Sequence, residues 1–279
     1  GGACIRELIP EELAHAQGYL CGANVREAGY YNALIHPLEG LAFTAQLFFQ
    51  GESEGGERAL AEKYAYELAL LVADERQRFA TGFPFYNVQL SSYREEGAAF
   101  FPWLDIIRMQ QFDAQRLIPD SALTVDMDLG APEGYPDWAH SPRKLELAER
   151  LAALVLARQY GIGNEREVVS PMPAAAYRTA DGKSVTVEFE NVGAGLTVSG
   201  HDPADSLGME VAGFSVGAYD YRTPARATVT SRCAVTVEIP ENAPDVSHVS
   251  YAFFRVVTPE NATLRGGNNL PAPAFSLAL

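Results

Sequence analysis

The chain is poor in cysteine, in positive charge and in long apolar runs, and each shortage excludes a class of protein. Its three cysteines, Cys4, Cys21 and Cys233, are too few and too scattered for a disulfide framework or a zinc site, although Cys4 and Cys21 could form one bridge. With 21 Lys and Arg against 36 Asp and Glu, the formal net charge is -15. That balance argues against binding to nucleic acid through the phosphate backbone. No apolar run approaches the roughly 18 residues of a membrane span.

The first 160 residues alternate between apolar strand patterns and helical patterns. A hydrophobic content of 47% in 279 residues supports one large domain or two ordinary ones. The nearly continuous apolar run Leu41–Gln50 predicts a strand that is buried on both faces. Further strands are expected at Phe83–Leu90 and Ala122–Asp128, and helices at Glu57–Phe79, Phe101–Ile118 and Pro142–Tyr160. Such alternation is typical of an α/β domain with a parallel sheet.

The pattern changes after about Asn164. Short alternating strands follow, such as Lys183–Glu190, and turns of Gly, Pro and Asn or Asp separate them. This pattern indicates an antiparallel β-sandwich. The sequence therefore predicts two domains, residues 1–164 and 165–279, with the boundary between Gly163 and Pro171.

The segment between the third strand and its following helix contains the clearest chemical pattern. Asp137 stands three residues before His140, and Ser141 and Pro142 then suit the N-cap and first position of a helix that stops at Gly161. A neutral imidazole that a carboxylate orients can deprotonate a serine in acyl transfer. The simpler alternative is that Asp137 is a turn residue and His140 a structural histidine.

A second pattern competes for the nucleophile. Gly51 to Gly55 matches G-x-S-x-G, the strand–turn–helix elbow of α/β-hydrolases, with Ser53 as its serine. Asp137 and His140 follow in the order of that family. In α/β-hydrolases, however, the acid and the histidine come from different strand ends, whereas here they share one loop. The D-x-x-H spacing is instead that of the SGNH, or GDSL, hydrolases.

A series of ordered blocks resembles the sialate O-acetylesterase family of SGNH hydrolases over nearly the whole chain. The blocks are GGACIREL at Gly1, YYNALIHPLEG at Tyr30, LFFQGESE at Leu47, FPFYNVQLSSY at Phe83, IRMQQ at Ile107, DMDLG at Asp126 with Asp137 and His140, SYAFF at Ser250 and NNLPAPAF at Asn268. This resemblance implies an SGNH-type three-layer αβα domain with a parallel sheet, incomplete at its N-terminus, followed by the antiparallel β-sandwich. It implies hydrolysis of O-acetyl groups on sialic acid or a related acetylated glycan, without metal or cofactor.

The resemblance also assigns roles to residues. His140 is implied as the general base and Asp137 as the acid that orients it. Gln50 matches the side-chain donor of the oxyanion hole, and Gly1 or Gly2 matches the block that supplies a backbone N–H to it. The same resemblance gives Glu52 a role in supporting the turn, while Arg108 and Gln111 are expected to be structural.

Two departures from the family pattern bear on the substrate. Glu54 stands where the family often has Asn, and Ser141 separates His140 from Pro142, where the family has His-Pro directly. They leave acetylated xylan or another acetylated sugar as an alternative to sialic acid.

The nucleophile of the resembled family is absent from these 279 residues. The family places its serine in a G-Q-S-N block, and the chain contains no such block. We therefore expect the serine in an upstream segment or a companion N-terminal chain. Two alternatives remain: a carbohydrate-binding or scaffold relative without catalysis, and an esterase that uses Ser53. Relatives in this family are often secreted, periplasmic or lysosomal, so the resemblance favours a secreted or periplasmic location.

Overall fold

The computed structural model describes residues 4–10, 28–79, 82–94, 99–137, 140–243 and 245–279. The chain forms two compact units, one of Gly1–Leu90 with Phe100–Ala122 and one of Ser91–Ala99 with Leu123–Leu279. The predicted mixture of a parallel α/β part and antiparallel strands is confirmed. The predicted domain boundary near residue 164 divides the chain elsewhere than these units do, and it stays a prediction. Among the described helices, none has the length and apolar character that crossing a membrane requires.

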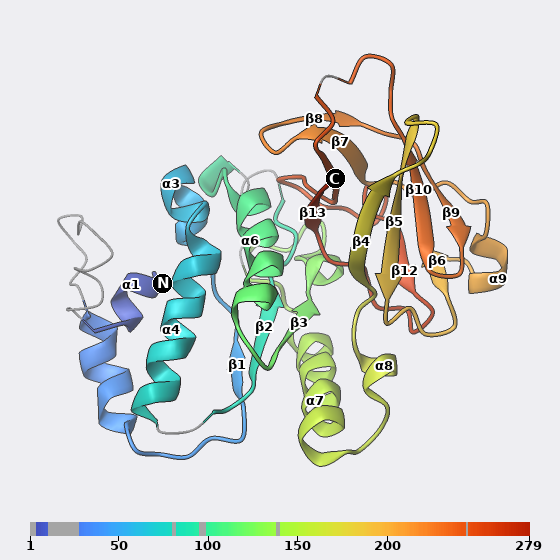
Figure 1. Cartoon of the computed structure of the whole chain (residues 1–279). Helices are drawn as coiled ribbons and strands as arrows, with labels where there is room; N and C mark the ends of the chain where they lie inside the picture. The colour runs from blue at the N-terminus through green and yellow to red at the C-terminus, as the bar shows by residue number, and fades with distance from the viewer. Residues whose placement is uncertain (1–3, 11–27, 80–81, 95–98, 138–139, 244) are drawn as a thin grey trace. The chain divides into compact units, whose positions relative to one another are not determined.

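A three-stranded sheet and two long helices form the centre of the first unit. The strand order is β1-β2-β3, and β1 and β2 run parallel with Gln46 opposite Phe85. The main elements are β1 (Gln46–Phe48), α4 (Tyr64–Arg78), β2 (Phe85–Gln89), α6 (Leu104–Leu117) and β3 (Ser121–Val125), and β3 leads into the second unit. Helices α4 and α6 lie side by side in Figure 1 and pack against each other. The expected strand–helix alternation is thus present.

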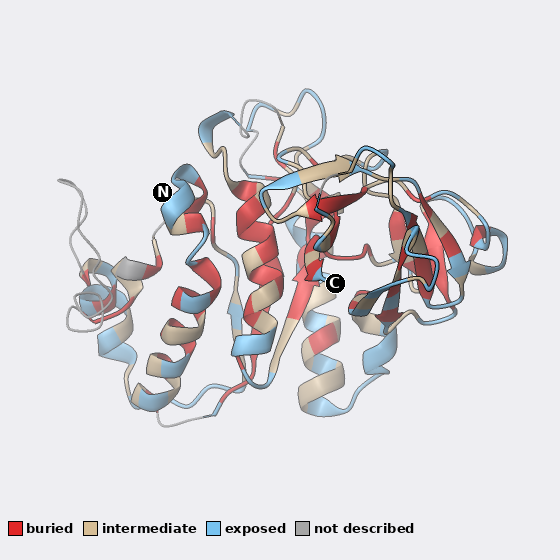
Figure 2. Cartoon of the chain, turned by 45° about the horizontal axis from the view of Figure 1, so that its top comes forward, coloured by how far each residue is buried: buried red, intermediate tan, exposed pale blue. Residues whose placement is uncertain are grey.

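The core of this unit follows β2 and α6. All five residues of β2 are buried, and α6 carries an almost continuous buried stripe in Figure 2. Two polar side chains of α6 inside it are bonded to the backbone. Arg108 Nε donates to the Leu90 carbonyl at 3.0 Å, and Gln111 Oε1 accepts the Leu90 N–H at 2.9 Å. Both α6 side chains therefore have the structural role that was expected of them.

The first strand differs from its prediction. Only Gln46–Phe48 form β1, and the run Leu41–Gln50 is not buried on both faces. Leu47 is 51% exposed and Phe43 is 41% exposed. Within the described ranges, β1 pairs with β2 alone. An apolar run is buried only where another element packs on it. Among the described residues, nothing pairs with the outer edge of β1, and Leu47 and Phe43 stay exposed.

Short helical turns connect these elements. They are α1 (Ile5–Leu8), η1 (Tyr31–Ile35), η2 (His36–Leu38), η3 (Glu54–Gly56) and α3 (Arg58–Ala61) in the first unit, and η4 (Met127–Leu129), α8 (Glu165–Val168) and α9 (Pro203–Ser206) in the second.

Antiparallel sheets make up most of the second unit. One four-stranded sheet has the order β4-β5-β10-β9, another has β13-β11-β7-β8, and β12 pairs with β6. The strands are β4 (Met172–Arg178), β5 (Ser184–Glu190), β6 (Leu196–Val198), β7 (Phe214–Ala218), β8 (Tyr221–Pro224), β9 (Ala227–Ser231), β10 (Ala234–Glu238), β11 (His248–Tyr251), β12 (Leu264–Gly266) and β13 (Phe275–Ala278). Phe189 of β5 and Phe275 of β13 bring the two larger sheets into contact, with ring centroids 5.9 Å apart.

Helix α7 (Lys144–Tyr160) precedes these sheets in the second unit. It ends as predicted, because Gly161 takes the left-handed conformation with φ 63°. Its start differs: the helix begins at Lys144, so Ser141 is not its N-cap and Pro142 is not its first residue. Its buried face contains Leu147 and Leu154, whereas Leu145 is 70% exposed.

Candidate active site

Asp137 and His140 meet as their spacing predicts. The carboxylate holds the histidine twice: Asp137 Oδ1 accepts the His140 backbone N–H at 3.0 Å, and Asp137 Oδ2 lies 2.8 Å from His140 Nδ1. Because an ionised carboxylate can only accept, Nδ1 is the donor in this contact, and in the neutral imidazole Nε2 is then the acceptor. The His140 side chain is 75% exposed. The histidine therefore has the orientation and the access that a general base needs.

Hydrogen bonds between side chains and backbone groups fix the loop that carries this pair. The Ser141 hydroxyl donates to the Leu129 carbonyl and accepts the Arg143 N–H at 3.2 Å. Arg143 Nη1 donates to the Asp128 carbonyl at 2.9 Å. The residue that was expected to cap the helix thus anchors the loop instead, since its hydroxyl reaches the preceding η4 turn.

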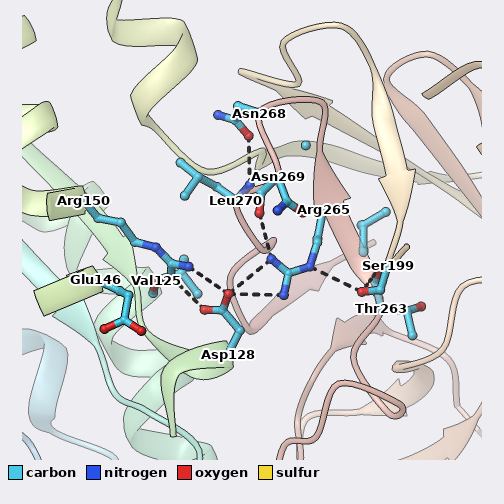
Figure 3. A network of polar contacts seen from close by, with 12 residues as sticks. Val125, Asp128, Glu146, Arg150, Ser199, Thr263, Arg265, Asn268, Asn269 and Leu270 are labelled. Atoms are coloured by element: carbon cyan, nitrogen blue, oxygen red, sulfur yellow. Dashed lines mark hydrogen bonds and ion pairs between the residues drawn. The ribbon is translucent and has the colours of Figure 1, made fainter. Parts of the chain in front are cut away.

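Asp128 joins this loop to the rest of the second unit. Its carboxylate makes a two-pronged contact with Arg150 of α7, at 2.7 and 2.8 Å, and its Oδ2 lies 3.2 Å from both terminal nitrogens of Arg265 on β12, as Figure 3 shows. Burial alone would raise the pKa of Asp128, but hydrogen bonds and charge from Arg150 and Arg265 outweigh burial and hold that pKa below its usual value. Helix, loop and sheet are therefore tied through one carboxylate.

Gln50 lies in the first unit, directly after β1, and three elements fix it. The Tyr64 hydroxyl of α4 donates to the Gln50 carbonyl at 2.7 Å, and Gln111 Nε2 of α6 donates to the same carbonyl at 3.0 Å. The side-chain amide donates from Nε2 to Glu54 Oε2 at 2.6 Å. The tight turn that follows needs glycine, because Gly51 has φ 143° and a Cβ there would lie 2.9 Å from Ile107.

Glu54, which the sequence marked only as a departure from the family pattern, is the buried acid of this turn. It is 1% exposed, and its Oε1 accepts the Ile5 backbone N–H at 2.7 Å. Burial raises its pKa to about 7. Glu52, which was predicted to support the turn, is only partly buried, and its role stays a prediction. A glutamate in a Gly-rich turn is usually solvated, so the sequence carried no signal for the burial of Glu54.

The remaining predicted residues are placed as follows. Gly1 and Gly2 lie outside the described residues. Ser53 has φ -62° and ψ -39°, which is ordinary helical backbone, whereas the nucleophile of an elbow sits on a strained turn. That geometry argues against Ser53 as nucleophile. His140 and Gln50 belong to different compact units. No cluster of three or more metal-ligating side chains occurs in the described part of the chain.

Comparisons with known proteins give a consistent assignment. No family model matches the chain. Sialate O-acetylesterase of Rattus norvegicus is 30% identical over 146 residues, which is 48% of this chain and 27% of that protein. Sialate O-acetylesterase of Mus musculus is 28% identical over 151 residues, which is 50% of this chain and 28% of that protein. The match thus spans about a quarter of the length of these relatives.

A solved structure extends the similarity to the whole chain. The crystal structure of a carbohydrate acetylesterase from Xanthomonas citri superposes with a TM-score of 0.78 and 24% identity. The superposition covers 99% of this chain and 59% of the other. At this identity the likeness shows a common fold. The sequence matches confirm the resemblance that the motifs predicted: over about half of its length the chain is similar to the sialate O-acetylesterases.

Proposed function

We propose that this chain supplies the base and an oxyanion donor of a carbohydrate acetylesterase. The observation that carries the proposal is the Asp137–His140 pair, whose carboxylate bonds leave Nε2 of an exposed imidazole as an acceptor. The relatives named sialate O-acetylesterase support the reaction class. We also place the parallel part of the fold in the SGNH type, for which the structural likeness is the support.

The proposed reaction passes through an acyl-serine. A serine hydroxyl attacks the acetyl carbonyl while His140 Nε2 takes its proton, and the tetrahedral intermediate collapses when His140 returns that proton to the departing sugar oxygen. Water then attacks the acyl-serine with the same base and releases acetate. The Gln50 amide, with a backbone N–H at Gly1 or Gly2, would hold the oxyanion. One such donor contributes about 2.7–4 kcal/mol in other acyl-transfer enzymes.

We place the nucleophile outside these 279 residues, in an upstream segment or a companion chain. The chain has no G-Q-S-N block, and the curated relatives are several times longer than the region they share with it. The outer edge of β1 also supports this idea, because within the described ranges it has no strand partner. Apolar side chains are exposed beside it, at Leu41, Phe43, Leu47 and Phe49. An open, apolar strand edge is a ready template for another strand.

The preferred substrate is an O-acetylated sialic acid, because the relatives carry that name. Acetylated xylan is the alternative. The two differ in charge, since sialic acid carries a carboxylate and xylan does not. Relative kcat/KM values on both substrates therefore separate them.

Hydrolysis of 4-nitrophenyl acetate tests the proposal. The chain should be inactive alone and active when joined to, or mixed with, a segment that supplies the G-Q-S-N serine. Activity of the chain alone that disappears in Ser53→Ala would favour the α/β-hydrolase alternative. Sugar binding without hydrolysis in either form would leave the non-catalytic relative as the better account.

A further inference from the structure

One buried carboxylate joins the two segments that the proposed function assigns to the oxyanion hole. Glu54 accepts the Gln50 side-chain amide on one oxygen, at 2.6 Å, and the Ile5 backbone N–H on the other, at 2.7 Å. The two donors are 45 residues apart in sequence. Ile5 begins α1 and belongs to the same sequence block, GGACIREL, as Gly1 and Gly2.

The carboxyl group has two features that suit it to this position. Both of its oxygens can accept, whereas an asparagine, which the resembled family often has here, offers one acceptor oxygen. Glu54 also lies out of water, at 1% exposure, where a hydrogen bond to a charged group is strong. This chain can thus hold both donor segments with one side chain.

We propose that Glu54 is a positioning residue that aligns the donors of the oxyanion hole. It fixes the Gln50 amide and the Ile5 backbone N–H at the start of α1. Glu54 orients the Gln50 amide by accepting from its Nε2 at 2.6 Å. The inference rests on the proposed function.

Protonation of Glu54 should weaken its hydrogen bonds with the Gln50 amide and the Ile5 N–H. A neutral carboxyl group has one O–H donor and loses one of the two accepting oxygens that the N–H groups require. Burial raises the pKa of Glu54 to about 7, and Glu67 of α4 adds a small rise. Among its titratable neighbours, Tyr64 donates to Gln50 and Glu52 stands on the same turn.

Two arginines on neighbouring helices form hydrogen bonds with other groups. Arg108 of α6 donates to the Leu90 carbonyl, and Arg58 of α3 bonds Glu62 at 2.7 Å. The titratable acid on α1, Glu7, accepts the Cys4 backbone N–H at 2.7 Å. The hydrogen bonds from Ile5 and Gln50 lower the pKa of Glu54 against the effect of burial, so its ionisation and the position of Gln50 are coupled.

The first arm of the test is kinetic and uses the active form with its serine. In Glu54→Gln, one oxygen is replaced by an N–H donor, so we expect kcat to fall at least tenfold with KM within twofold, since the hole acts on the transition state. Glu54→Asn should recover part of that loss. Glu75→Gln is the matched control, because Glu75 is also buried and accepts a glutamine amide, that of Gln46, at 2.6 Å. It should change kcat less than twofold.

The second arm needs no hydrolysis. In the ¹⁵N-labelled chain, the Gln50 side-chain amide and the Ile5 backbone amide should shift together with a midpoint near pH 7, and Glu54→Gln should abolish that titration. Gln50→Ala identifies the side-chain signal. Flat signals in the wild type, or an unchanged kcat in Glu54→Gln, would overturn the inference. If no form hydrolyses esters, the proposed function fails while the titration still decides the role of Glu54. If Glu54→Gln does not fold, the wild-type titration decides alone.

Discussion

The two halves of the proposed site are built in opposite ways. His140 and Asp137 form an i, i+3 pair on an exposed loop of the second unit, where the histidine side chain is 75% exposed. Gln50 and Glu54 form an i, i+4 pair in the first unit, where the glutamate is 1% exposed. A base must exchange protons with substrate and water, whereas an oxyanion donor must be fixed and dry. Both pairs arise from residues three or four apart in sequence. They differ in exposure, which suits one pair to proton transfer and the other to holding a hydrogen-bond donor in place.

Removing the exposed partner should have the largest effect. His140→Ala is expected to lower kcat/KM of the active form about 10⁴-fold or more, because the serine loses its proton acceptor. Steady-state hydrolysis of 4-nitrophenyl acetate measures this loss. Ser53→Ala serves as the control and should stay within about threefold. Equal losses of activity in both variants would contradict this account and favour Ser53 as the nucleophile.

Removing the amide donor, Gln50, should have a smaller effect of a different kind. Gln50→Ala is expected to lower kcat about 10²- to 10³-fold with little change in KM, because the amide acts on charge that develops in the transition state. The kcat and KM of the variant on 4-nitrophenyl acetate give the split. A rise in KM at constant kcat would instead assign Gln50 to substrate binding.

Burial of the glutamates should appear in the pH dependence of stability. Burial raises the pKa of Glu75 to about 7, above the 4.5 of an exposed glutamate, so the folded state binds this proton more tightly between those values. Stability is then full below pH 4.5 and falls as the pH rises through 7, by about 3 kcal/mol for one such group. Urea unfolding at pH 4.5 and 8 should show a smaller fall in Glu75→Gln than in the wild type. Parallel curves would mean that Glu75 does not titrate as a buried acid.

Removing Asp128, which anchors the loop of the Asp137–His140 pair, should have the smallest effect, and that effect should be on stability. Asp128→Ala leaves Arg150 and Arg265 without their shared carboxylate, and we expect a loss of about 2 kcal/mol, below the 3–5 kcal/mol of fully buried pairs. The lowered pKa of Asp128 has the opposite sign to that of Glu75: its contribution is present above the unfolded pKa and is lost as the pH falls through the folded one. Thermal unfolding at pH 7 and pH 3 tests both points. A variant as stable as the wild type at pH 7 would show that the loop does not depend on this network.

The sequence predicted what depends on local pattern. The buried strand β2, helix α6 and the end of α7 at Gly161 follow from apolar period and capping, and the Asp137–His140 contact follows from a three-residue spacing. The prediction for Leu41–Gln50 was wrong, because an apolar run does not state whether a neighbour covers it.

Other features depend on contacts between distant residues, and the sequence could not give them. Glu54 lies in the η3 turn, which packs against α3 and α6, and Ile5, whose N–H it accepts, is 49 residues away. Asp128 joins Arg265, which is 137 residues away. Such partners are set by tertiary packing, so neither residue carries a local pattern that marks it.

The central claim is that the exposed His140 imidazole and the Gln50 amide serve one transition state. A crystal structure of the active form with a fluorophosphonate bound covalently at its nucleophile tests this most directly. The account predicts an adduct on a serine that lies outside the 279 residues, with one phosphonyl oxygen within hydrogen-bond distance of Gln50 Nε2 and His140 Nε2 beside the modified serine. An adduct on Ser53, or one that lies out of reach of either side chain, would contradict it.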